Sequence, residues 1–276
     1  MKTPRVLSIQ DISCYGQCSL TVALPILSAM GIETAILPTA ILSTHTTGFS
    51  GFTFHDMKDE LPKIVEHWHK ENIRFDGVYT GYLGNVGDVQ VALGIAKSEL
   101  NRGPLFVDPA FGDHGKLYPG FDDDYVAAMV ALAKEADVLL PNLTEACALL
   151  KIPYVEKPSE EQIREIIAKL HDLGAKAVVL KGIGSDDTNT GIVVSGKGNI
   201  SFYTHERMPQ DFHGTGDVFA STLVGAYFRR CNLFGAAMLA ADFTCACIKN
   251  TMDDPDHAYG VHFERTLPML GIVLED

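Results

Sequence analysis

Apolar segments of two kinds alternate along most of the chain. Short, continuously apolar runs predict strands, and longer segments with apolar residues at helical spacing predict helices. The expected strands are Arg5–Gln10, Thr34–Leu42, Gly77–Thr80, Leu105–Asp108, Val138–Pro141, Ala177–Lys181, Thr190–Ser195 and Ile200–His205. The expected helices are Ser19–Met30, Met57–Glu71, Val86–Leu100, Asp123–Ala133, Thr144–Leu150, Ser159–Leu173, Thr215–Arg230, Leu233–Asn250 and a short Phe263–Leu270.

This alternation predicts an α/β fold built on a mostly parallel, doubly wound sheet. Strands that are apolar throughout are typical of a parallel sheet with helices on both faces. The last two strands are separated only by Gly196, Lys197, Gly198 and Asn199, which predicts an antiparallel hairpin near one edge of the sheet. Because no repeat and no linker-like segment divides the chain, residues 1–276 are expected to form a single domain.

The net charge and the cysteine content limit the kinds of partner and environment that this chain suits. The 22 Lys and Arg against 35 Asp and Glu give a net charge of −13, which argues against nucleic acid or an anionic membrane as the main partner. The six cysteines match no zinc-site spacing, so reduced thiols in the core of a cytoplasmic protein are expected. The first residues run directly into a predicted strand, so no signal peptide is expected.

The stretch from Asp211 to Phe219 is the most informative part of the chain. Gly214 and Gly216 flank Thr215, Asp217 follows, and helix-spaced apolar residues come next, so a tight loop is expected to open into a helix. The unpaired amides and the dipole at a helix N-terminus favour an anion. With Asp217 as a base beside it, such a site suits phosphoryl transfer to a hydroxyl. A glycine-rich turn with an ordinary first-turn aspartate is the alternative.

Further polar residues follow the other predicted strands. In an open α/β sheet, ligands bind beyond the carboxyl ends of the strands, so these residues are expected at one rim. With the glycine-rich loop they make seven clusters: Gln10-Asp11, Ser43–Thr46, Gly81-Tyr82, Asp108-Pro109, Asn142 with Glu145, Lys181-Gly182 and Gly214–Asp217.

Each cluster has a chemical and a structural interpretation. Asp108 and Asp113 could hold the Mg²⁺ that accompanies ATP, or they could cap a turn and face solvent. Asn142 and Glu145 could lie near phosphates and metal, or they could simply cap the next helix. Lys181 could contact phosphates as a point charge, or it could be a strand-end lysine whose stem covers apolar surface.

The remaining clusters suit a small aromatic ligand. Thr44, His45, Thr46 and Tyr82 could stack on and hydrogen-bond a small ring, although His45 alone is more often structural. Asp11 could accept a hydrogen bond from a substrate hydroxyl, or it could cap a turn.

Taken together, these residues resemble a known family. Gly214-Thr215-Gly216-Asp217 resembles the anion-hole and catalytic-base signature of the ribokinase-like superfamily. Five other segments resemble, in the same order, the motifs of pyridoxal/pyridoxamine kinases: Val6–Gln10, Leu42–Thr46, Thr80–Gly84, Val107–Asp113 and Pro141–Glu145. The resemblance extends from about Val6 to about Lys249.

The resemblance implies a fold and a reaction. It implies a ribokinase-like three-layer sandwich and ATP-dependent phosphorylation of the 5′-hydroxyl of pyridoxal, pyridoxine or pyridoxamine. Asp217 would be the catalytic base, and Gly214, Thr215 and Gly216 would form the anion hole. The other implied roles are Mg²⁺ binding by Asp108, Asp113 and Glu145, ATP binding by Asn142, Lys181 and Gly182, and substrate binding by Asp11, His45, Thr46 and Tyr82. Family members are typically homodimers, and many also need K⁺.

Two other functions compete with this one. Asp11 stands where pyridoxal kinases often have serine, and Lys181-Gly182 is similar to the strand end of hydroxymethylpyrimidine kinases, so a hydroxymethylpyrimidine kinase of the same fold is the first alternative. The second is a non-catalytic protein that binds a B6 vitamer, which the intact Gly214–Asp217 stretch argues against. A redox Rossmann protein is disfavoured because no G-x-G-x-x-G follows the first strand.

Overall fold

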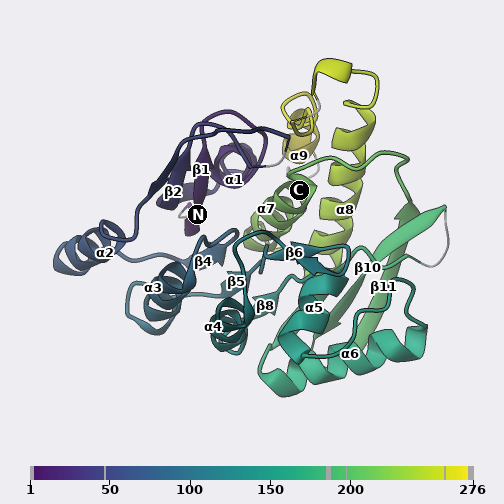
Figure 1. Cartoon of the computed structure of the whole chain (residues 1–276), viewed down its shortest axis with the longest axis horizontal. Coiled ribbons are helices and arrows are strands. Elements are labelled where there is room, and N and C mark those ends of the chain that lie inside the picture. Colours follow the sequence, from purple (N-terminus) through teal and green to yellow (C-terminus); the bar gives the residue numbers. More distant parts are fainter. Residues whose placement is uncertain (1–2, 47, 185–187, 197, 258, 273–276) are drawn as a thin grey trace. The chain divides into compact units, whose positions relative to one another are not determined.

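The computed structural model describes residues 3–46, 48–184, 188–196, 198–257 and 259–272. The chain forms two compact units, and their helices and strands are labelled in Figure 1. Unit 1 consists of Met1–Leu61 and Met208–Asp276, and unit 2 consists of Pro62–Arg207. That both units act as the single domain expected from the sequence stays a prediction.

Unit 1 combines the first strands with the last helices of the chain. Its elements are β1 (Arg5–Ser13), α1 (Leu20–Ala29), β2 (Glu33–Leu42), β3 (Phe54–Asp56), α7 (Thr215–Phe228), α8 (Leu233–Lys249), the short 3₁₀ helix η1 (Pro255–His257) and α9 (Pro268–Ile272). Strands β1 and β2 are parallel, and β3 pairs antiparallel with β2. Helix α1 packs on both long strands and on α7, and α7 packs on α8.

Unit 2 contains the longer run of strands. Its elements are α2 (Leu61–Lys70), β4 (Gly77–Thr80), α3 (Val86–Lys97), β5 (Leu105–Val107), β6 (Gly112–Asp113), β7 (Lys116–Leu117), α4 (Asp123–Ala133), β8 (Val138–Leu139), α5 (Leu143–Leu150), α6 (Glu160–Leu173), β9 (Ala177–Lys181), β10 (Asn189–Gly196) and β11 (Asn199–Glu206). Strands β4, β5, β8 and β9 are parallel neighbours in that order. The antiparallel β10–β11 hairpin follows β9, with β11 at the edge, as the sequence predicted.

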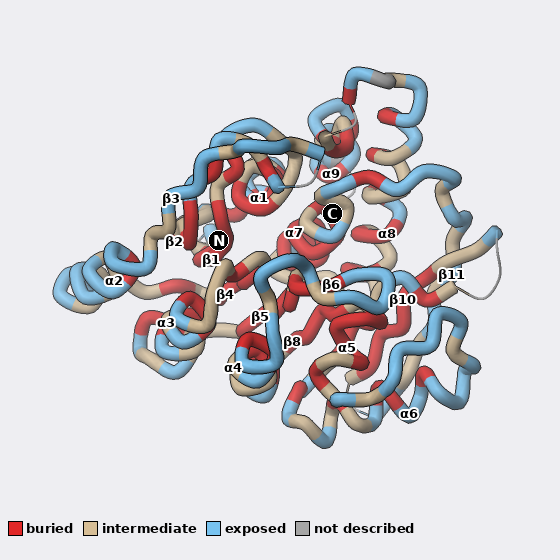
Figure 2. The backbone as a smooth tube through the Cα atoms, in the orientation of Figure 1, coloured by how far each residue is buried: buried red, intermediate tan, exposed pale blue. Residues whose placement is uncertain are grey.

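The buried interior includes most of β1 in unit 1 and of β4, β5, β8, β9 and β10 in unit 2, whereas no residue of β3 or β11 is buried (Figure 2). All four residues of β4 are buried, as expected for a strand covered on both faces. Helix α7 is unusual because every residue from Val218 to Ala226 is buried. At Gly225 a Cβ would collide with the sulfur of Met30, so a larger residue there would displace the Met30 side chain. The helix that carries the predicted catalytic base therefore has a rigid core position.

The predicted α/β class and mostly parallel sheet are confirmed. Three segments match their predicted bounds: Gly77–Thr80, Ala177–Lys181 and Asp123–Ala133. Helix α2 begins at Leu61 and not at Met57, with Pro62 in its first turn, a position that proline favours. The last helix occupies Pro268–Ile272, so its predicted range was too early. Strands β3, β6 and β7 were missed, because two or three residues carry no periodicity.

The expectation about cysteines was partly wrong. All six, each in the described part of the chain, are free thiols, but only Cys147 and Cys247 are buried, and Cys14 is exposed. Among the described residues, no helix has both the length and the apolar character that crossing a membrane requires.

Candidate functional site

The glycine-rich stretch forms the loop and helix start that the sequence predicted. Gly214 is the N-cap of α7 with φ 77°, in the left-handed region, and a Cβ there would overlap the carbonyl oxygen of Gln17. No side chain of the described residues caps this helix, and the Thr215 hydroxyl instead donates to the carbonyl of Phe212 at 3.1 Å. Asp217 lies in the first turn. The loop therefore offers the backbone amides of a helix N-terminus with a carboxylate beside them.

A second carboxylate of unit 1, Asp11, is buried at an irregularity in strand β1. The register with β2 shifts between Gln10 and Ile12, and Asp11 is only 4% exposed. The Ser13 hydroxyl donates to its Oδ2 at 3.1 Å. Burial raises the pKa of Asp11, and hydrogen bonds from Ser19 and Ser13 oppose that rise. Ser19 precedes α1 at φ 50° without capping it, a strained backbone conformation of the kind found at functional sites.

Cys18 is the residue in this region that sequence reasoning missed. Burial raises the pKa of its thiol above the usual range, and the carboxylates of Asp11 and Asp217 raise it further. The charges of Asp11 and Asp217, the two predicted site carboxylates of unit 1, therefore both favour the neutral form of the Cys18 thiol. No spacing signal could have found Cys18, because its neighbours come from the first strand and from α7, about 200 residues later.

His45 lies on the same side of unit 1 as the glycine-rich loop. Its Nε2 is 3.0 Å from the carbonyl oxygen of Tyr259, and its ring centre is 5.5 Å from that of His213, which directly precedes Gly214. Burial lowers the pKa of His45, and the neighbouring His213 lowers it further. The structure thus brings His45 next to the glycine-rich loop, whereas the adjacent Thr46 is exposed.

In unit 2, Lys181 and Asp108 form a buried ion pair. Lys181 Nζ donates to both carboxylate oxygens of Asp108, each at 2.8 Å. The side chains are 14% and 4% exposed. Burial raises the pKa of Asp108, and the ammonium of Lys181 opposes that rise. The sequence predicted both residues at the rim but not that they pair.

Asn142 and Glu145 form a capping box at the start of α5. The Asn142 side chain accepts from the Glu145 amide at 2.9 Å, and Glu145 Oε2 accepts from the Asn142 amide at 2.8 Å. Glu145 Oε1 also accepts from the Phe111 amide at 3.1 Å. Burial raises the pKa of Glu145 to about 8, although the charge of Lys181 lowers it. The capping interpretation is therefore correct, and the same contacts tie α5 to the segment after β5.

The other predicted residues of unit 2 are less enclosed. Asp113 lies in the β6–β7 hairpin with its side chain 51% exposed, 3.6 Å from His114. Gly182 is exposed with φ 70°. Tyr82 is half-buried, with its ring 5.5 Å from that of Phe121. In the described part of the chain, no group of three or more His, Cys, Asp or Glu side chains is arranged to hold a metal ion.

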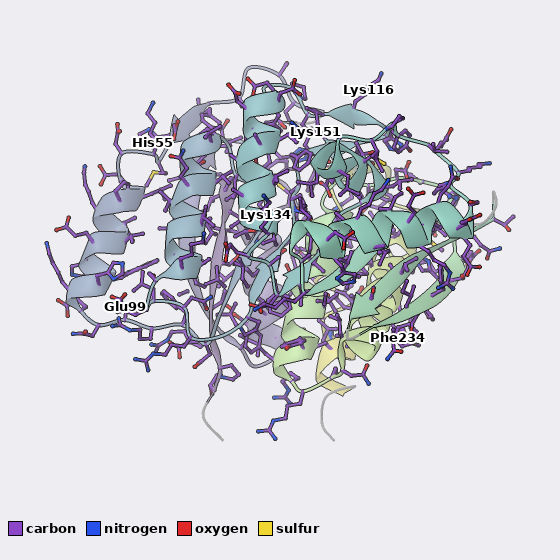
Figure 3. The ribbon with its side chains drawn as sticks, turned by 90° about the horizontal axis from the view of Figure 1, so that it is seen from below. His55, Glu99, Lys116, Lys134, Lys151 and Phe234 are labelled. Atoms are coloured by element: carbon purple, nitrogen blue, oxygen red, sulfur yellow. The ribbon has the colours of Figure 1, made fainter. Side chains whose placement is uncertain are left out.

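A cavity of about 420 Å³ lies beside the β6–β7 hairpin. Its lining comes from the hairpin, from α4, and from α5 with the segment that follows it, and includes Gly115, Thr144, Lys151 and Tyr154. The Thr144 hydroxyl accepts from the Gly115 amide at 2.9 Å, which ties the hairpin to the helix. Figure 3 shows two basic side chains of this region, Lys116 on the hairpin and Lys151 at the end of α5.

Known proteins are similar to this chain in sequence and in fold. The profile described as phosphomethylpyrimidine kinase matches residues 24–262. A crystal structure of a "putative phosphomethylpyrimidine kinase" from Bacteroides thetaiotaomicron, solved with pyridoxal, is 34% identical, covers 98% of this chain and 96% of its own, and has a TM-score of 0.92. The pyridoxal kinase of Lactobacillus plantarum is 32% identical, covers 99% of both chains and has a TM-score of 0.93.

A third structure adds a bound nucleotide. The pyridoxal kinase of Leishmania donovani in complex with ADP and pyridoxine is 26% identical, covers 96% of this chain and 95% of its own, and has a TM-score of 0.86. These matches span nearly the whole chain. The chain therefore belongs to the phosphomethylpyrimidine kinase family and is a kinase of ribokinase-like fold.

Proposed function

We propose that this kinase transfers the γ-phosphoryl group of ATP to the 5′-hydroxyl of a B6 vitamer. The observation that carries this proposal is the start of α7, where Gly214 and Asp217 combine a helix N-terminus with a carboxylate. The relatives that bind pyridoxal, pyridoxine and ADP support the choice of substrate and nucleotide. Pyridoxal, pyridoxine and pyridoxamine all carry the required hydroxyl.

Unit 1 supplies the groups that act on the transferring phosphoryl. The amides of Thr215 and Gly216 would hold its oxygens, because they lie at the N-terminus of α7, where the helix dipole favours negative charge. Asp217 would accept the proton of the attacking hydroxyl, which is the role of the base in phosphoryl transfer to alcohols. This loop geometry requires glycine at position 214, because a Cβ there would overlap the carbonyl oxygen of Gln17.

Four residues are proposed to bind the vitamer. Tyr82 and Thr46 would hold the pyridine ring, His45 would contact it from beside His213, and Asp11 would accept from a polar substituent. For His45 the support is its position beside His213, and for Asp11 it is the effect that Asp11 and Asp217 share on the thiol of Cys18.

Asn142, Lys181 and Gly182 are proposed to bind the nucleotide phosphates, with Mg²⁺ arriving on ATP. The residues present fit a Mg²⁺ that is held mainly by phosphates and waters, because one carboxylate, Asp113, is exposed to solvent. They fit a set of three direct carboxylate ligands less well, since both oxygens of Asp108 and both of Glu145 already accept hydrogen bonds. Bound there, Mg²⁺ would neutralise phosphate charge during transfer.

A coupled ADP-release assay tests the function. Pyridoxal, pyridoxine, pyridoxamine and hydroxymethylpyrimidine would each be offered with Mg·ATP. We expect ADP release that depends on a B6 vitamer. Ligand binding with no ADP release on any of the four alcohols would contradict the proposal and favour a non-catalytic binding protein.

Hydroxymethylpyrimidine is the second candidate substrate. It is favoured by the description of the matching family and by the buried carboxylate of Asp11, which can accept from an amino group on the ring. The ratio of kcat/KM for the pyrimidine and for pyridoxal decides between the two. A ratio above one would replace the substrate and keep the mechanism.

A cytoplasmic homodimer is also proposed, on the basis of the family resemblance alone. Light scattering on the purified protein would measure the oligomeric state. Turnover with and without K⁺ would test whether this chain shares the K⁺ requirement of many relatives.

A further inference from the structure

The buried ion pair of unit 2 has a symmetrical geometry. Lys181 Nζ lies 2.8 Å from each oxygen of the Asp108 carboxylate, so both oxygens of one carboxylate hold the ammonium. The carboxylate is almost entirely removed from solvent, and the lysine retains slight exposure. Charge-assisted hydrogen bonds are strong and directional at such distances. The carboxylate therefore fixes where the ammonium lies.

Rigid backbone carries both partners. Lys181 ends β9 and its amide donates to Pro141 at 2.9 Å, while Asp108 follows β5 and its amide donates to Thr80 at 3.0 Å. Strand β8 lies between β9 and β5, so the two backbones are about 10 Å apart. The lysine side chain reaches across the end of β8 to the carboxylate, and its terminal ammonium remains at the carboxyl ends of the strands.

These contacts leave Asp108 poorly suited to direct metal binding. A metal ion on its carboxylate would have to displace the ammonium from one oxygen or both, and would leave a buried cation without its partner. The neighbouring Glu145 is engaged as well, because backbone amides of Asn142 and Phe111 bond its two oxygens.

We propose that Asp108 is a positioning residue that holds the ammonium of Lys181 where it meets the nucleotide phosphates, and that it is not a ligand of Mg²⁺. This inference rests on the proposed function, which assigns phosphate contact to Lys181. Asp108 acts on the nucleotide only through the lysine.

The direction in which Asp108→Asn changes nucleotide affinity separates this positioning role from simple neutralisation of the lysine charge. If Asp108 only neutralised Lys181, its replacement by asparagine would make the region more positive and would tighten nucleotide binding. If Asp108 positions Lys181, the same change releases the side chain and weakens binding.

The test measures ADP affinity by calorimetry in the presence of EDTA, so that no metal contributes. We expect Lys181→Gln to weaken ADP binding about tenfold, which is the scale of one lost charge-assisted contact. Asp108→Asn should weaken it by a similar factor. The Asp108→Asn/Lys181→Gln double variant should bind no more weakly than Lys181→Gln alone, because residues that act as a unit are non-additive.

A second readout tests the metal assignment. The Mg²⁺ concentration for half-maximal rate, at saturating ATP, should be the same in Asp108→Asn as in the wild type. The KM for ATP should rise, and the KM for pyridoxal should stay unchanged.

Asp137→Asn is the matched control. Asp137 also pairs with a lysine, since Lys176 Nζ lies 2.7 Å from its Oδ1, and its Oδ2 accepts from the Leu105 amide. Lys176 is largely exposed, so this pair is of the surface type. Asp137→Asn should therefore show the effect on stability of losing an Asp–Lys pair, and it should leave the affinity for ADP unchanged.

Three outcomes are decisive. Tighter or unchanged ADP binding in Asp108→Asn, with a large rise in the Mg²⁺ requirement, would make Asp108 a metal ligand and overturn the inference while leaving the kinase function intact. Failure of the wild type to bind ADP or to turn over would instead overturn the proposed function. If Asp108→Asn does not fold, the double variant, which does not leave the Lys181 ammonium buried without its partner, decides: its ADP affinity should match that of Lys181→Gln, and an unchanged Mg²⁺ requirement would support positioning.

Discussion

The glycine-rich loop of unit 1 and the Asp108–Lys181–Glu145 cluster of unit 2 are built in different ways. The loop is contiguous, Gly214 to Asp217, and its chemistry comes from backbone conformation and a helix end. The cluster joins residues up to 73 positions apart, and its chemistry comes from buried side chains that bond one another and the backbone. A backbone-built site can be recognised in sequence, whereas a side-chain cluster cannot be understood until its partners are known.

The largest expected effect is on the base of the contiguous site. Asp217→Asn should lower kcat by a factor of about 10² to 10⁴, the usual contribution of a general base, while the thermal midpoint stays close to that of the wild type. Steady-state kinetics and thermal unfolding measure the two quantities. Asp211→Asn, an exposed change six residues earlier, is the control and should retain its rate. A kcat within a few-fold of wild type would remove Asp217 from the role of base.

The second prediction tests whether backbone conformation builds the loop. Gly214→Ala should destabilise the protein by about 1 to 3 kcal/mol and lower the rate, because the residue has positive φ and its Cβ would overlap Gln17. Gly216→Ala is the matched control, since apart from its chain neighbours and the backbone of its own helix no heavy atom of the described residues lies within 4 Å of the position that its Cβ would occupy. Urea unfolding of both variants gives the difference. Equal stability of the two would contradict the account of the loop.

The third prediction separates capping from nucleotide binding. Asn142→Ala and Asn85→Ala each remove an N-cap side chain, at α5 and α3, and each should cost about 1 kcal/mol of stability. Only Asn142 also donates to the Gly112 carbonyl, at 2.8 Å, and is proposed to contact phosphates. The KM for ATP should therefore rise several-fold in Asn142→Ala and remain constant in Asn85→Ala. A similar rise in both variants would mean that the effect is structural.

The smallest effect concerns His45 and pH. The folded-state pKa of His45 is below its usual value of 6.5, so the unfolded chain binds more protons as the pH falls through that value. His45 therefore contributes stability that is present above pH 6.5 and is lost on acidification. His45→Gln should flatten the decline of the thermal midpoint between about pH 7 and pH 5. The exposed His55→Gln, at the position labelled in Figure 3, should leave the slope as in the wild type. An identical slope in all three proteins would contradict the burial argument for His45.

Sequence reasoning succeeded where the signal is local. Strand β9 and helix α4 were predicted to the residue, because an apolar run and an Asp122 N-cap mark their ends. The antiparallel hairpin followed from its glycine-rich turn. The positive φ of Gly214 was predictable for the same reason, since glycine is the residue that such a loop requires.

It failed where tertiary contacts decide. The pairing of Lys181 with Asp108 needs the order of strands β5, β8 and β9, which spacing does not give. Cys18 approaches Asp11 and Asp217 only because α7 packs on α1. Both residues of the capping box could be read from sequence, but the bond from the Phe111 amide to Glu145 could not. The fold class was thus largely predictable, and the internal bonding of the site was not.

The most direct test of the central claim is to follow the phosphoryl group itself. Phosphorus NMR of a mixture of Mg·ATP, pyridoxal and the protein would show whether the γ-phosphoryl group becomes a phosphate monoester of the 5′-hydroxyl. The account predicts that the ester forms in step with ADP for the wild type and is absent for Asp217→Asn. ADP formed without the ester, or an ester formed equally well by Asp217→Asn, would contradict it.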